Sequence, residues 1–239
     1  MATKLPLVPA AMIGSAALAL MTFAPGLSAK PRLQTGPDAE VTFDGLHRVD
    51  KTVMSAAWVK PDLDLRPYEK LMIVGAGITY APLDEEGERW WPGRSDMTEF
   101  PIDEEARERF REEVSTAFVE GLSDIEGYEI VTEPGPQTLM LVAGVIDVIS
   151  RVPPADECVG RCDIYLTDVG EATLVLELRD AVTGEVLVRA ADRRAADAAF
   201  PIDASSSVTV WPEVRRLAST WARMVRKRLE DFETIDDLG

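Results

Sequence analysis

The stretch "EATLVLELRDAVTGEVLVRAADRR" (residues 171–194) decides the fold, because it reads as a β-hairpin. Its first half alternates, so that one side is apolar and the other is polar. The apolar side carries Ala172, Leu174, Leu176 and Leu178, and the other side carries Thr173, Glu177 and Arg179. "DAVTG" then turns the chain, since Gly184 can take the left-handed conformation that a bulged hairpin loop needs. An antiparallel pair of strands is therefore predicted here.

Three further segments are typical of strands. "TLMLVAGVIDVISRV" (138–152) is apolar on both faces, which indicates a central strand. "YEKLMIVGAGITYA" (68–81) is predicted to be a buried strand, and "YEIVTE" (128–133) a short one. Because residues 138–152 are apolar on both sides, we expect the second face of the sheet to be covered as well, by residues 30–65.

Two segments are amphipathic in the manner of helices. In "IDEEARERFREEVSTAFVEGLSD" (102–124), apolar residues recur at a spacing of three or four, and Asp103 is placed to cap the first turn. "PEVRRLASTWARMVRKRLEDF" (212–232) has a similar apolar stripe, with Pro212 in its first turn. The predicted class is α+β: a largely antiparallel sheet of about four to six strands, with two amphipathic helices packed on one face.

The first 29 residues predict a secretory signal peptide. They hold one charge, Lys4, an apolar run from about Val8 to Phe23, and small residues up to Ala29. An uncleaved anchor is the alternative. No cysteine follows the apolar run to form a lipobox, so we expect a periplasmic protein with no stable membrane span after cleavage.

The remaining chain is expected to have three parts. Residues 30–65 form an extended N-terminal segment packed on the domain, residues 66–232 a single α/β domain, and residues 233–239 an acidic tail. The formal net charge of the whole chain is −17. Such an acidic surface argues against nucleic acid as a partner and against adsorption to anionic lipid.

Both cysteines lie in "ADECVGRCDIY" (155–165), as Cys158 and Cys162. A structural zinc site needs four ligands, and the chain offers two cysteines and one distant histidine, His47. A thioredoxin-type redox pair has two residues between its cysteines, whereas here there are three. We therefore favour a structural disulfide in an oxidising compartment, with the redox pair and the metal site as alternatives. We expect no metal and no cofactor.

The best candidate for a ligand contact is "RWWPGR". Trp90 and Trp91 lie in a long loop between Arg89 and Arg94, and aromatic and arginine residues dominate binding hot spots. The alternative is that one or both tryptophans fold back onto the sheet. No catalytic residues are predicted: "GAGITY" (75–80) lacks the third glycine of a dinucleotide loop, and the chain has no G-x-S-x-G motif.

Several motifs occur in an order that resembles a known family. They are "FDGLHRVD" (43–50), "AAWVKPDLDLRPYEKLMIV" (56–74), the hairpin above and the tryptophan-containing final helix. The chain is similar over residues 43–232 to a family of bacterial envelope proteins, often lipoproteins, that is catalogued only as a domain of unknown function. This resemblance implies export to the Gram-negative envelope and a small α/β domain, and it supplies no catalytic residue.

These observations predict a non-enzymatic exported envelope protein with a structural or protein-interaction role. Its partner would be an envelope protein or a glycan. The alternative is a periplasmic ligand-binding module that uses the Trp90/Trp91 loop for a glycan or a peptide.

Overall fold

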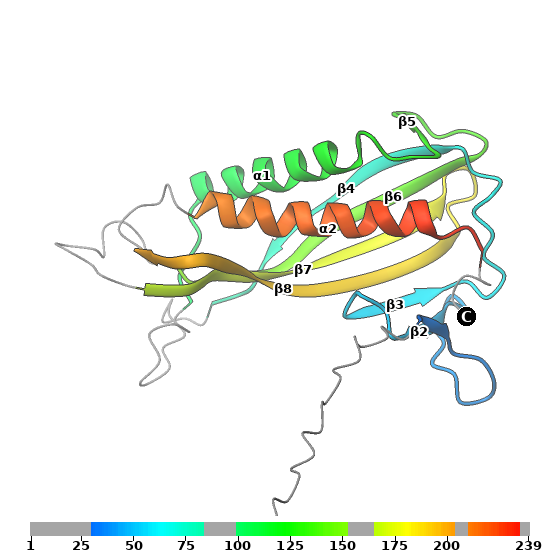
Figure 1. Cartoon of the computed structure of the whole chain (residues 1–239), viewed down its shortest axis with the longest axis horizontal. Coiled ribbons are helices and arrows are strands. Elements are labelled where there is room, and N and C mark those ends of the chain that lie inside the picture. Colours follow the sequence, from blue (N-terminus) through cyan, green and yellow to red (C-terminus); the bar gives the residue numbers. More distant parts are fainter. Residues whose placement is uncertain (1–29, 84–98, 153–164, 204–209, 235–239) are drawn as a thin grey trace, which may run out of the picture.

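A computed structural model describes residues 30–83, 99–152, 165–203 and 210–234. This part of the chain forms one sheet and two long helices (Figure 1). The strands are β1 (Arg32–Leu33), β2 (His47–Asp50), β3 (Ala56–Val59), β4 (Lys70–Tyr80), β5 (Glu129–Val131), β6 (Thr138–Ser150), β7 (Tyr165–Asp180) and β8 (Val186–Asp203). The helices are α1 (Glu104–Leu122) and α2 (Trp211–Asp231).

The sheet corrects the predicted fold class. It has eight strands in the order β1-β2-β3-β8-β7-β6-β4-β5, more than the four to six expected. It is mixed, because β4 pairs in parallel with both β5 and β6. The other pairs, including the β7–β8 hairpin, are antiparallel.

The parallel pairs follow from the order of elements along the chain. Helix α1 lies between β4 and β6, and a strand joined to its neighbour through a helix returns in the same direction. The strands at 68–81 and 138–152 were predicted from their composition, and the helix between them was predicted too. The prediction was wrong because this strand–helix–strand order was not read as a crossover.

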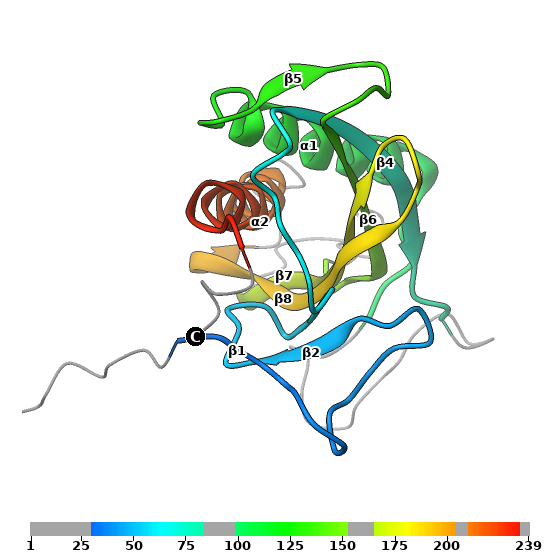
Figure 2. The same ribbon diagram turned by 90° about the vertical axis from the view of Figure 1, so that its right-hand side faces the viewer.

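Both helices pack on one face of the sheet, which curves around them (Figure 2). They run parallel to each other: Arg215 Nε, near the start of α2, lies 2.6 Å from Glu113 Oε2 in the middle of α1. Glu126 N, just after α1, donates at 3.0 Å to Glu230 Oε1 near the end of α2. The predicted cap of α1 is confirmed, since Ala106 N donates to Asp103 Oδ1 at 2.7 Å. The apolar stripe predicted for the final helix is also confirmed, and its members are all buried: Val214, Leu217, Ala218, Trp221, Val225 and Leu229.

The alternation predicted for β7 is confirmed as well. Its apolar side is buried beneath the helices, whereas Thr173, Glu177 and Arg179 lie half-buried on the opposite face. Residues 30–65 do not cover that opposite face over β4 and β6 as expected, although their turn at 41–47 meets Arg189 of β8 on it. They supply β1, β2 and β3, which extend the sheet beyond β8. Among the described residues, neither helix covers the face away from the helix layer over β4, β6 and β7.

Three of the long strands, β4, β6 and β7, have irregular backbone where they pair. Register shifts fall after Gly75 in β4, between Ile146 and Ile149 in β6, and between Asp168 and Glu171 in β7. Gly77, Asp147 and Gly170 have positive φ at or beside these points. Such bulges bend strands and increase their twist, so they account for the curvature of the sheet around the helices.

Candidate functional site

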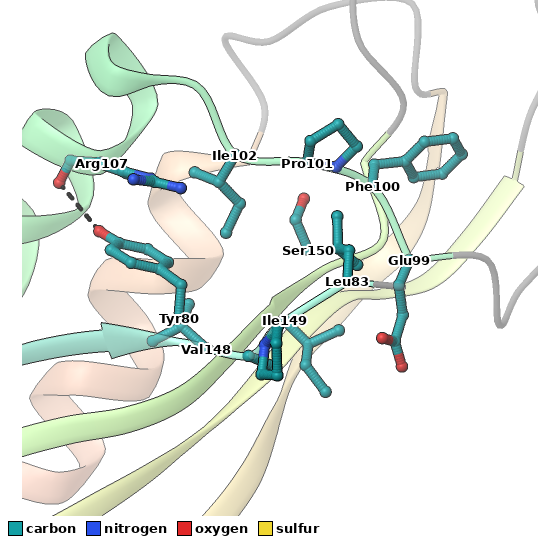
Figure 3. A pocket seen from close by; sticks show the side chains of 12 residues that line it. Tyr80, Leu83, Glu99, Phe100, Pro101, Ile102, Arg107, Val148, Ile149 and Ser150 are labelled. Atoms are coloured by element: carbon teal, nitrogen blue, oxygen red, sulfur yellow. Dashed lines mark hydrogen bonds between the residues drawn. The ribbon is translucent and has the colours of Figure 1, made fainter. Parts of the chain in front are cut away.

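A cavity of about 330 Å³ lies where the ends of β4 and β6 meet the start of α1 (Figure 3). Tyr80 and Arg107 form one end of it, and Glu99 and Phe100 the other. Its walls are mainly apolar, from these side chains: Leu83, Pro101, Ile102, Val148 and Ile149. A concave, largely apolar site with a few polar groups is the usual form of a small-molecule pocket.

Arg107 is the cation of the cavity. Its guanidinium carbon lies 4.8 Å from the centre of the Tyr80 ring, and the Tyr80 hydroxyl donates to the Arg107 carbonyl oxygen at 3.4 Å. Arg107 Nε is buried and has no hydrogen-bond partner among the described residues. Burial raises the pKa of Tyr80, against the opposing charges of Arg107 and Arg111. The cavity is thus lined by a neutral phenol and by an arginine whose Nε has no hydrogen-bond partner among the described residues.

The cavity has few groups for catalysis. Among its lining residues the ionisable ones are Tyr80, Glu99 and Arg107, and the Tyr80 ring already stacks on Arg107. Within the part of the chain that the structure describes, no cluster of three histidine, cysteine or acidic residues could hold a metal ion. Proton transfer needs an acid or base poised towards a reacting group; among the described lining residues these groups are Tyr80 and Glu99.

The predicted site residues lie outside the described residues. These are Arg89, Trp90, Trp91 and Arg94 of the long loop, and Cys158 and Cys162 of the expected disulfide. The loop nevertheless departs from Leu83 and returns at Glu99, and both of these residues line the cavity. His47 is described, and its Nδ1 lies 2.9 Å from the Gln34 carbonyl oxygen at the β1–β2 edge.

A second candidate site is the face of the sheet away from the helices, which we call the open face. It consists of half-buried side chains from four strands: Met72, Val74, Met140, Val142, Val175, Glu177, Arg179 and Arg189. Val74, Val142, Glu177 and Arg189 are cross-strand neighbours in one row. The half over β4 and β6, together with Val175 of β7, is therefore apolar, and the half formed by Glu177, Arg179 and Arg189 is charged.

The charged half is internally paired. Glu177 accepts from Arg189 Nε at 2.8 Å and also from Arg179, and Arg189 reaches both oxygens of Asp44 at 2.8 and 3.2 Å. Burial alone would raise the pKa of Glu177, but the hydrogen bonds from Arg179 and Arg189 outweigh it and lower the pKa. The hydrogen bond from Arg189 likewise lowers the pKa of Asp44. These groups keep their charges and fix one another in place.

Next to this network the turn that begins "FDGL" holds Phe43, whose side chain is 96% exposed. The exposure of this ring was not predicted from the sequence, although the motif "FDGLHRVD" is part of the family resemblance. The Asp-Gly pair at 44–45 was the available signal, because such a pair predicts a tight turn that presents its neighbours to solvent.

The model of the family described as a protein of unknown function, DUF3313, matches residues 40–225. That is most of the segment, 43–232, over which the family resemblance was predicted, so the resemblance is confirmed. No curated protein matches the chain.

Three solved structures show how distant the known structural relatives are. A PelC dodecamer from Paraburkholderia phytofirmans is 10% identical, with a TM-score of 0.32, over 71% of this chain and 96% of that one. A DUF330 protein from Xanthomonas campestris is 9% identical, with a TM-score of 0.36, over 68% and 87%. A neuraminyllactose-binding hemagglutinin homolog from Helicobacter pylori is 10% identical, with a TM-score of 0.34, over 67% and 83%. Such weak likenesses assign no ligand or partner to this chain.

Proposed function

From the premise that this chain belongs to the DUF3313 family, we propose that it is a non-enzymatic, exported protein of the bacterial envelope that works by binding another protein. The binding surface is the open face. A glycan or peptide in the cavity is the second candidate, argued separately below.

The observation that carries the proposal is the composition of the open face. Its apolar half groups the side chains of Met72, Val74, Met140, Val142 and Val175 on neighbouring strands, and neither helix covers them. Its charged half is pre-ordered by ion pairs. Protein interfaces commonly combine an apolar centre with a polar rim, and contiguous apolar surface on a protein marks interaction sites.

Export is supported by the sequence of residues 1–29, which has the order of a signal peptide. No helix among the described residues has the length and apolar character needed to span a bilayer. The periplasm is the compartment we propose.

A single substitution on the open face tests the interaction. Val142 faces Val74 and Glu177, so Val142→Lys places a charge in the apolar half while its ammonium can still reach Glu177. We expect wild-type protein, tagged at its C-terminus and recovered from the periplasm, to retain a partner that Val142→Lys loses. Thermal unfolding by circular dichroism should show both variants folded.

The matched control is Val119→Lys. Val119 is an exposed valine on α1, on the helix side of the molecule. This variant should retain the partner. Loss of the partner from both variants, or from neither, contradicts the assignment of the open face.

The cavity favours a second function, the binding of a glycan or peptide. Arg107 Nε is an unused buried donor, and the chain segment that carries Trp90 and Trp91 begins and ends at the cavity wall. A ligand with an oxygen acceptor and an apolar portion would match this wall. Soluble peptidoglycan fragments supply carboxylate and amide oxygens of this kind.

We expect such fragments to shift the tryptophan fluorescence of the mature protein, with half-saturation below a millimolar concentration. Arg107→Gln should weaken this binding about tenfold, since a hydrogen bond to a charged group contributes about 1.5–3 kcal/mol. Arg111→Gln, on the exposed surface of the same helix, is the control. An unchanged spectrum at millimolar ligand counts against the second function.

A further inference from the structure

The turn formed by Val41–His47 presents an aromatic ring almost entirely to solvent. Phe43 is 96% exposed, and the neighbouring Val41 is 47% exposed. Single exposed apolar residues are common on proteins and need no function. What distinguishes Phe43 is how firmly the turn that carries it is held.

Four hydrogen bonds hold the turn from within. Thr42 N donates to the Leu46 carbonyl at 2.9 Å, and Leu46 N donates to Thr42 Oγ1 at 2.9 Å. Gly45 N donates to the Thr42 carbonyl at 3.0 Å, and Thr42 Oγ1 donates to Asp44 Oδ1 at 2.6 Å. Gly45 has a φ of +84°, which favours glycine, and Leu46 is buried beneath the turn.

The turn is also held from the sheet. Arg189 donates to both carboxylate oxygens of Asp44, and its guanidinium carbon lies 5.7 Å from the centre of the Phe43 ring. Arg189 is itself fixed by Glu177 at 2.8 Å. A bidentate arginine–carboxylate pair has a defined geometry, so the turn cannot swing away from β8 without breaking it.

We propose that Phe43 is the anchor by which this protein binds its partner, and that it enters an apolar socket rimmed by basic residues on that partner. The inference rests on the proposed function, because Asp44 and Arg189 join the turn to the charged half of the open face. A rigid ring that is already ordered loses little conformational entropy on binding, and buried aromatic side chains dominate interface hot spots.

The charge of the chain indicates the chemistry of the socket rim. The whole chain carries a formal charge of −17. Asp38, Glu40 and Asp44 lie in or beside the turn, where Arg48 lies 3.7 Å from Glu40 and Arg189 pairs with Asp44, so the excess negative charge is that of the chain as a whole. Positive charge on the partner would speed its association with this surface. A second copy of the chain would instead meet like charge, and so would an anionic membrane, so a cationic protein surface fits best.

The experiment places p-benzoylphenylalanine at residue 43 of the full chain in the producing bacterium. Irradiation should join this residue to one protein, which is then identified and purified. The same photo-reactive residue at position 182 is the control, because Val182 is also exposed on a tight turn, at the tip of the β7–β8 hairpin. No such adduct should form from position 182.

Measured affinities then show whether Phe43 contributes to binding or only lies near the partner. With the identified partner and the purified mature protein, Phe43→Ala should weaken the Kd about 30-fold, and Val182→Ala should leave it unchanged. Asp44→Ala should weaken it less, about threefold to tenfold, because the ring remains while its support is lost. The Kd should also rise with salt. The substituted side chains are exposed or at the surface, and circular dichroism should show folded protein.

The outcomes distinguish this inference from the proposed function. If Val142→Lys abolishes binding of the identified partner and Phe43→Ala does not, the open face stands and the anchor is wrong. If neither substitution matters, both proposals fail. An adduct only with lipid, or only with a second copy of the chain, also overturns the anchor as stated.

Discussion

Replacing Asp192 with alanine is expected to lower the free energy of unfolding by about 3–5 kcal/mol, the scale for removing one member of a buried polar network. Asp192 is 2% exposed and lies in β8 beneath α2. Its Oδ2 accepts from Trp221 Nε1 at 2.9 Å and from Arg194, and its Oδ1 accepts from Ser55 N at 3.0 Å. Alanine would leave these donors without an acceptor while they stay in place.

The cost falls chiefly on the indole of Trp221, which is fully buried in α2. A buried donor that loses its acceptor costs about 1–3 kcal/mol, and the Ser55 amide adds a second loss. Urea unfolding followed by tryptophan fluorescence would measure the effect. It should appear as a lower midpoint at an unchanged slope.

Asp192→Asn is the matched variant for this test. Asparagine keeps the shape and an acceptor oxygen, and removes the negative charge. We expect Asp192→Asn to lower the free energy of unfolding clearly less than Asp192→Ala does. The double variant Trp221→Phe and Asp192→Ala should lose less unfolding free energy than the sum of the two single losses, because the indole donor is already gone. Equal losses for Asn and Ala would show that one acceptor oxygen cannot replace the two that the carboxylate offers.

The burial of Asp192 and its hydrogen-bond partners could not be predicted from the sequence. Alternation along β8 places Asp192 on the same face of the sheet as Ala190. Its cross-strand partner in β7 is the buried Leu174. From the sequence, a single carboxylate after several apolar residues predicts that the buried part of the strand has ended, because charged residues are rarely buried unless they are paired. Its ion pair is with Arg194, two residues later, but its other hydrogen bonds come from Trp221, 29 residues later, and from Ser55, 137 residues earlier. Nothing local in the sequence brings them together.

The helices and the hairpin were predictable because their signals are local. The apolar stripe of α2 and the alternation of β7 each depend on residues a few positions apart. The parallel pairing of β4 with β6 depends on how α1 carries the chain across the sheet. Strands β7 and β8 also extend to Tyr165 and Asp203, beyond the segments predicted at 171–180 and 185–194. Their outer parts contain polar and small residues and pair through register shifts, which periodicity does not reveal.

The candidate sites were predictable in smaller part. The predicted Trp90/Trp91 site belongs to a segment whose two ends line the cavity, although the tryptophans themselves lie outside the described residues. No local signal in the sequence distinguished Arg107 from the other charged residues of its helix. Its contact with Tyr80 requires β4 to end beside the first turn of α1, which is a property of the fold.

Gly170→Ala is expected to destabilise the protein by at least about 3 kcal/mol, at the upper end of the range for overpacked sites. Gly170 lies in β7 opposite Ser150 of β6, and its φ is +148°. A Cβ built on its backbone would lie 2.0 Å from the Ile149 carbonyl oxygen and 3.1 Å from the Ile149 carbonyl carbon. Both atoms belong to the backbone, so no side-chain rotation can relieve the clash.

Relief of that clash would have to move one strand away from the other. Arg151 N donates to the Val169 carbonyl at 3.0 Å beside this point, so such a movement would strain the adjoining ladder. The methyl group would therefore distort the bulge at which β6 and β7 bend. This distortion would change the curvature of the sheet around α1 and α2. A loss of urea stability together with a changed near-ultraviolet circular dichroism spectrum is the result we expect.

Gly75→Ala separates this effect from the general cost of replacing a strand glycine. Gly75 lies beside the bulge of β4, has no positive φ, and would bring its new methyl group within 4 Å of nothing outside its immediate chain neighbours. Its stability should change by less than about 0.5 kcal/mol, the usual range for surface substitutions. If Gly170→Ala were as mild as Gly75→Ala, the close approach of Ile149 to β7 would be wrong. The bulges could then no longer be held responsible for the bend of the sheet.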